Sequence, residues 1–100
     1  MIEFKREQAD GAHEYLQIVR LDYKRTFVSE ALGGKRSPFI VQITSDSGGH
    51  GDFVGVFDLD GDKIDAHGLS WEIADDVPAE VIEAVETGWD DCDNVLTRAA

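Results

Sequence analysis

Four aspartates lie close together in the stretch VFDLDGDKID, which spans residues 56–65. They are Asp58, Asp60, Asp62 and Asp65. Closely spaced carboxylates serve proteins as nucleophiles, as general acids and as ligands for hard cations such as Mg²⁺ and Ca²⁺. The stretch therefore admits three interpretations: a hydrolase motif, a cation-binding loop, or a turn between two strands.

The letters FDLDGD resemble the first motif of the haloacid-dehalogenase-like phosphatases. This resemblance implies that Asp58 is a nucleophile and Asp60 a general acid. The family, however, has Thr or Val where Asp62 stands, and it builds a long α/β core after the motif. Only 38 residues follow Asp62 here. A metal-assisted hydrolase that uses the Asp58–Asp65 cluster is kept as the enzymatic alternative, because a short motif needs its structural context to confirm it.

A dedicated calcium loop does not fit the spacing of these residues. An EF-hand loop has glycine at its sixth position and glutamate at its twelfth. In this chain Gly61 directly follows the second aspartate, and no glutamate falls at the required distance. Because neither the hydrolase motif nor the calcium loop fits, the sequence assigns no metal site, no catalytic residue and no cofactor.

A turn explains the same stretch better. Asp60 and Gly61 form the Asp-Gly pair that is favoured in two-residue type I′ turns between alternating segments. Counting outward from that turn places Asp58 opposite Lys63 as a cross-strand ion pair. The preceding segment FIVQIT, residues 39–44, alternates apolar and polar residues and predicts another strand. Together these segments predict a three-stranded antiparallel meander.

Two helices are expected to flank the meander. The first covers residues 11–32, where apolar residues recur at intervals of three and four before the glycines of ALGG: Ala12, Tyr15, Leu16, Val19, Tyr23 and Phe27. Ile18, Leu21 and Val28 fall off this stripe, so a pair of strands is the alternative. The second helix is expected to have Asp75 and Asp76 at its N-terminus and Pro78 in its first turn, with Gly88 just past its end.

The chain length and composition set the broad class. One hundred residues are expected to form a single α+β domain over 1–100, with the meander packed against an N-terminal and a C-terminal helix. Cys92 is the only cysteine, which excludes an intramolecular disulfide and favours a reducing, cytoplasmic compartment. No apolar run approaches the roughly 20 residues that span a bilayer, and no signal peptide is apparent.

The net charge of −12 is distributed unevenly along the chain. Residues 1–50 carry seven acidic and seven basic side chains, whereas residues 51–100 carry fourteen acidic and two basic ones. On a helix, carboxylates three or four residues apart are separated by about 4.5 to 6 Å. The negative electrostatic field of this acidic half attracts basic proteins and repels nucleic acid and anionic membranes. The partner expected is therefore a basic protein surface, with the oligomeric state left open.

The size, the acidic second half, the expected element order and the late segment VIEAVETGWDD resemble the small acidic phage anti-CRISPR proteins that act as DNA mimics. The resemblance implies an inhibitor without catalytic activity that docks on a nucleic-acid-binding complex. The residues assigned to partner binding are Glu80, Glu83, Glu86, Asp90 and Asp91, with Asp58, Asp60, Asp62 and Asp65 as a second patch. An immunity protein against a basic nuclease toxin and an ordinary domain from a salt-loving host are the alternatives.

Overall fold

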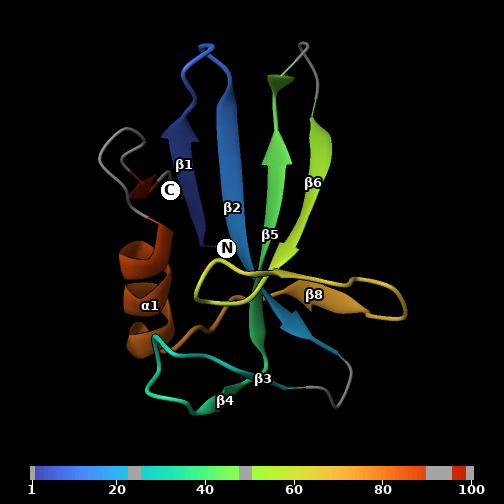
Figure 1. Ribbon diagram of the computed structural model, residues 1–100, viewed down its shortest axis with the longest axis vertical. Helices are drawn as coiled ribbons and strands as arrows, with labels where there is room; N and C mark the ends of the chain where they lie inside the picture. Colours follow the sequence, from blue (N-terminus) through green and yellow to red (C-terminus); the bar gives the residue numbers. More distant parts are fainter. Residues whose placement is uncertain (1, 23–25, 48–50, 90–95, 99–100) are drawn as a thin grey trace.

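The computed structural model describes residues 2–22, 26–47, 51–89 and 96–98. In this part of the chain, a seven-stranded antiparallel sheet packs one of its faces against one helix, α1 (Ala79–Trp89) (Figure 1). The sheet runs in the order β7-β6-β5-β2-β1-β9, and β8 pairs with the part of β2 that β1 does not reach. Its strands are β1 (Glu3–Glu7), β2 (His13–Leu21), β5 (Phe39–Ser45), β6 (Asp52–Phe57), β7 (Lys63–Ile64), β8 (Trp71–Ile73) and β9 (Thr97–Arg98).

This mostly β architecture contradicts the expected α+β fold of a three-stranded meander between two helices. The expected helix over residues 11–32 is wrong. Residues 13–21 of that segment form β2, and residues 27–28 form β3 (Phe27–Val28), which pairs with β4 (Arg36–Ser37) in a separate two-stranded sheet. The alternative interpretation of residues 11–32, a pair of strands, therefore agrees with the structure.

The misleading helical stripe arises because β2 is a central strand. β5 pairs along one side of it, and β1 and β8 pair along the other. Leu16 and Ile18 are buried on the face that packs against α1, and Val19 and Leu21 are buried on the opposite face. With both faces buried, apolar residues occupy adjacent positions and the period-two signature of a half-exposed strand is lost.

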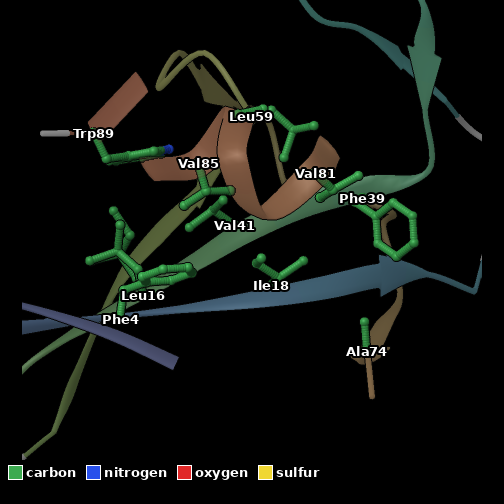
Figure 2. Packing of buried hydrophobic residues seen from close by; sticks show 12 residues of the cluster. Phe4, Leu16, Ile18, Phe39, Val41, Leu59, Ala74, Val81, Val85 and Trp89 are labelled. Carbon is green, nitrogen blue, oxygen red and sulfur yellow. The ribbon is translucent and has the colours of Figure 1, made fainter. Parts of the chain in front are cut away.

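The C-terminal helix is present, but it begins at Ala79, after Pro78 rather than before it, and it includes Gly88. α1 begins directly after Pro78, whose carbonyl accepts the first helical hydrogen bonds, from the N–H groups of Val81 and Ile82. Its buried side chains, Val81, Ala84, Val85 and Trp89, pack on a cluster that includes Phe4, Leu16, Ile18, Val41 and Leu59 (Figure 2). No helix in the described ranges is long and apolar enough to cross a membrane.

The hairpin between β6 and β7 is present, but its turn differs from the expected one. Phe57, rather than Asp58, lies opposite Lys63. A type I′ turn requires positive φ at both central residues, whereas in this turn only Gly61 has a positive φ, of 94°. The turn is therefore longer than two residues, the register moves by one, and the expected cross-strand pair of Asp58 and Lys63 does not form.

The face of the sheet opposite α1 has its own small core. Val19, Leu21, Ile40 and Val56 are buried there beneath apolar side chains of the segment that leads into β8: Ala66, Leu69 and Trp71. The Trp71 indole nitrogen donates a 3.0 Å hydrogen bond to the side-chain oxygen of Gln42 on β5. Both faces of the sheet are thus covered by the second half of the chain.

We expect that replacing Gly88 by alanine destabilises the protein. Gly88 lies inside α1 rather than past its end, and an added Cβ would sit 2.7 Å from the backbone oxygen of Leu59. Overpacking against backbone costs about 1–3 kcal/mol, which exceeds the roughly 1 kcal/mol that alanine contributes to a helix relative to glycine.

Chemical denaturation of the wild type, Gly88→Ala and a control variant measures the change in the free energy of unfolding. Gly51→Ala is the matched control, because Gly51 does not have a positive φ and its added Cβ would meet nothing within 4 Å. We expect Gly51→Ala to remain within about 0.5 kcal/mol of the wild type. A Gly88→Ala protein as stable as the wild type would contradict the close packing of α1 against the hairpin.

Candidate acidic docking surface

The outer face of α1 carries exposed carboxylates. Glu80, Glu83 and Glu86 are all exposed, while the opposite side of the helix is buried in the core. Their spacing of three residues corresponds to a rise of about 4.5 Å between neighbours. Asp75 and Asp76, just before the helix, are also exposed, and the last turn of α1 contains no basic residue. This face therefore presents closely spaced negative charge on a rigid element.

The turn that joins β3 to β4 lies near α1 (Figure 1). A groove of about 440 Å³ beside these carboxylates is lined by residues of α1 and of that turn. Glu80 and Glu83 contribute carboxylates to its lining. Its other lining residues, Ala31, Leu32, Ala84 and Thr87, are small or apolar. A groove of this composition suits the aliphatic stem and charged head of a lysine or arginine side chain.

Asp60 holds the turn that forms one wall of the groove. Its carboxylate accepts hydrogen bonds from the hydroxyl of Ser29 at 3.0 Å and from the backbone N–H groups of Glu30 and Ala31, each at 2.6 Å. Burial by itself raises the pKa of Asp60, but the hydrogen bonds from Ala31, Glu30 and Ser29 outweigh it and hold that pKa below its ordinary value. Asp60 therefore links the β6–β7 turn to the turn after β3.

Asp58 organises its own turn. One of its carboxylate oxygens, Oδ1, accepts the backbone N–H groups of Asp60 and Asp62, each at 3.0 Å. Burial raises the pKa of Asp58, and the charges of Asp60 and Asp62 act in the same direction, against the two hydrogen bonds that lower it. Asp58 and Asp60, which resemble a nucleophile and its general acid in the sequence, thus both accept hydrogen bonds from backbone N–H groups.

The predicted contact residues therefore separate into groups. Glu80, Glu83 and Glu86 share the helix face, whereas Asp62 and Asp65 are exposed on the β6–β7 hairpin and the segment after it. Asp58 and Asp60 are only partly exposed and are committed to hydrogen bonds within the protein. Asp90 and Asp91 lie outside the described residues.

Sequence reasoning missed the wall formed by Ala31 and Leu32, because these residues were assigned to a helix. The available signal was the pair of glycines that follows them. Gly33 and Gly34 both have positive φ, 70° and 82°, which a turn requires and a helix interior does not. Two adjacent glycines after a short apolar segment indicate a turn as readily as a helix end.

A second cluster joins the ends of β2 and β5. Asp46 accepts the backbone N–H of His13 at 2.5 Å, lies 3.3 Å from the His13 ring nitrogen Nδ1, and accepts the Tyr15 hydroxyl at 3.4 Å. The hydrogen bond from the His13 backbone is the main cause that lowers the pKa of Asp46, against the opposing effect of burial. Burial and the charge of Asp46 raise the pKa of Tyr15, which disfavours the phenolate needed for nucleophilic chemistry.

Comparisons with known proteins add no relative to this geometry. No family model matches the chain, no curated protein matches it, and no solved structure matches it. In the described part of the chain, no group of three or more His, Cys, Asp or Glu side chains is placed to hold a metal ion.

We expect Asp60→Asn to destabilise the protein at neutral pH and Asp58→Asn to leave it unchanged or more stable. Both oxygens of Asp60 accept hydrogen bonds, so an amide would place an NH₂ group against a donor, at a cost of about 1–2 kcal/mol in this partly solvated site. Both hydrogen bonds to Asp58 go to Oδ1, which asparagine retains.

Denaturation at a series of pH values tests both statements. The folded pKa of Asp60 is lowered, so its charged form contributes stability in full above the unfolded value of about 3.9, and this contribution is lost as the pH falls through the folded pKa. The difference between wild type and Asp60→Asn should therefore shrink on acidification. If Asp58→Asn and Asp60→Asn change the free energy of unfolding equally at neutral pH, the distinct roles of Asp58 and Asp60 are contradicted.

Proposed function

We propose that this protein is a non-catalytic acidic binding protein that docks on a basic surface of a nucleic-acid-binding protein. It acts as a DNA mimic, for example as an inhibitor of a phage-defence nuclease complex. The observation that carries the proposal is the exposed row of Glu80, Glu83 and Glu86 on a rigid helix, beside a groove that two of these carboxylates line. A rigid row of charges binds at a lower entropic cost than charges on a mobile loop.

The electrostatics favour a cationic macromolecule over other partners. The whole net charge of −12 comes from residues 51–100, which include α1. A field of one sign steers an oppositely charged partner toward the surface and raises the association rate. Nucleic acid and anionic lipid carry the same sign as this surface and are repelled by it.

The spacing of the helix carboxylates supports mimicry of a nucleic acid. Duplex DNA carries one charge per about 1.7 Å of helix axis when both strands are counted, and about 3.4 Å along each strand. The rise of about 4.5 Å between Glu80, Glu83 and Glu86 is of the same order. A channel whose lysines and arginines bind phosphates thus finds comparable partners on α1.

Two alternatives use parts of the same evidence. An immunity protein against a basic nuclease toxin would need the same acidic surface, so the partner's identity separates it from an inhibitor of a defence complex. A metal-assisted hydrolase would need free carboxylates in the Asp58–Asp65 cluster. The hydrogen bonds of Asp58 and Asp60 to backbone groups support a structural role for these two residues instead.

We expect the triple reversal Glu80→Lys, Glu83→Lys and Glu86→Lys to weaken partner binding by at least about tenfold without unfolding the protein, because all three side chains are exposed. The matched control reverses Glu7, Asp22 and Glu72, which are exposed outside α1 and change the net charge equally. Tagged wild type and both variants are used to capture proteins from the native host.

The captured protein is then purified, and its binding is measured at several salt concentrations and against duplex DNA. We expect DNA to compete and binding to weaken above physiological salt, where the Debye length falls below about 8 Å. Binding that both triple variants retain, or that DNA does not displace, would overturn the proposal.

A further inference from the structure

A second cavity, of about 350 Å³, lies where the end of α1 meets β1, β2, β5 and β6. The strand register positions its polar groups, because Arg6 on β1 lies directly opposite Glu14 on β2. Ile43, Val54, Phe57 and Trp89 supply apolar and aromatic wall. Asp60 also lines this cavity, but both of its carboxylate oxygens accept hydrogen bonds from the turn after β3. None of the glutamates on the outer face of α1 lines the cavity, so it is separate from that face.

Arg6 is held in place but keeps hydrogen-bonding capacity. Its Nε and Nη2 atoms each lie 2.8 Å from Oε1 of Glu14, and its Nη1 donates to the backbone oxygen of Trp89 at 3.3 Å. The guanidinium carbon also lies 5.7 Å from the centre of the Trp89 ring. A guanidinium carries five N–H donors, so some remain for a ligand.

Glu14 has its hydrogen bonds on one oxygen only. Oε1 accepts from Arg6 and, at 2.6 Å, from the side-chain amide of Gln8. Oε2 has no hydrogen-bond donor within the described ranges of the chain. The side chains of Arg6 and Glu14 are only 17% and 15% exposed, so solvent screens a ligand's charges only partly at this position.

The aromatic wall is tightly packed. Phe57 and Trp89 meet edge to face with ring centres 5.2 Å apart, and Trp89 is 7% exposed. The indole N–H of Trp89 is buried and has no acceptor in the described part of the chain. The cavity therefore combines the charged groups of Arg6 and Glu14 with one aromatic wall, and small-molecule sites combine such polar and apolar groups.

The adjacent opposite charges decide which ligand fits. An anion alone is attracted by Arg6 and repelled by Glu14, and a cation alone meets the reverse arrangement. A zwitterion satisfies both, with a carboxylate against the spare Arg6 donors and an ammonium against Oε2 of Glu14. We propose that this cavity binds a free α-amino acid with an apolar side chain, which packs against Ile43, Val54, Phe57 and Trp89.

Titration of the full chain with L-leucine and L-phenylalanine, followed by amide NMR shifts and calorimetry, tests the proposal. We expect saturable shifts at the residues that line the cavity. N-acetyl-leucine lacks the ammonium group and leucinamide lacks the carboxylate, so both should bind at least about tenfold more weakly. L-Lysine and L-glutamate, which would place a second charge against the apolar wall, should not bind.

Variants separate loss of binding from loss of folding. Glu14→Gln should weaken leucine binding at least about tenfold, and Val54→Trp should block the cavity while leaving Arg6 and Glu14 intact. Glu80→Gln, on the other surface, should bind leucine as the wild type does. Absence of saturable binding to the folded wild type, or equal binding of leucine and leucinamide, would overturn the proposal without affecting the proposed docking of α1.

Discussion

Burial of both faces of β2 and β5 is the constraint on which the rest of the structure depends. Each central strand has apolar side chains on both sides, for example Ile18 and Val19 on β2 and Ile40 and Val41 on β5. A sheet buried on two faces needs two covering layers. α1 supplies one, and the segment that ends at Trp71 supplies the other. Both layers come from the acidic half of the chain, so an amphipathic helix that buries its valines must present its glutamates to solvent.

The stretch that looked catalytic illustrates how burial and hydrogen bonding divide identical side chains. The pKa of Asp58 is raised and the pKa of Asp60 is lowered, although the two residues stand two positions apart. Divergent pKa values in a pair of carboxylates often indicate an acid and a base. Here burial raises the pKa of Asp58 against its hydrogen bonds, whereas at Asp60 the hydrogen bonds outweigh burial and lower the pKa. Asp58 shapes the β6–β7 turn and Asp60 holds the turn after β3. Through Asp60 the motif holds in place the turn that forms one wall of the groove beside α1.

The two proposed sites differ in their electrostatics, and this difference separates their ligands. Among the described residues, the charged ones that line the groove beside α1 are Glu80 and Glu83, which suits a cationic side chain. The cavity at the end of α1 holds Arg6 and Glu14 as adjacent opposite charges beside an aromatic wall, while Asp60, which also lines it, is hydrogen-bonded to the turn after β3. This arrangement suits a ligand that carries both charges. Salt screens the first interaction more than the second, because the first is exposed and the second is partly buried.

Local sequence signals by themselves determined several elements of the structure. These are the C-terminal helix with its acidic outer face, the strand over FIVQIT, and the presence of a turn at Asp60 and Gly61. These features follow from capping, periodicity and backbone preference, which act within a few residues. Only the tertiary structure decided that residues 13–21 form a strand, because burial on both faces erased the alternating pattern. It alone also decided that Asp60 reaches Ala31 and that Arg6 and Glu14 meet Trp89. Those contacts join segments far apart in sequence, and their partners are set by sheet register and packing, which no local pattern specifies.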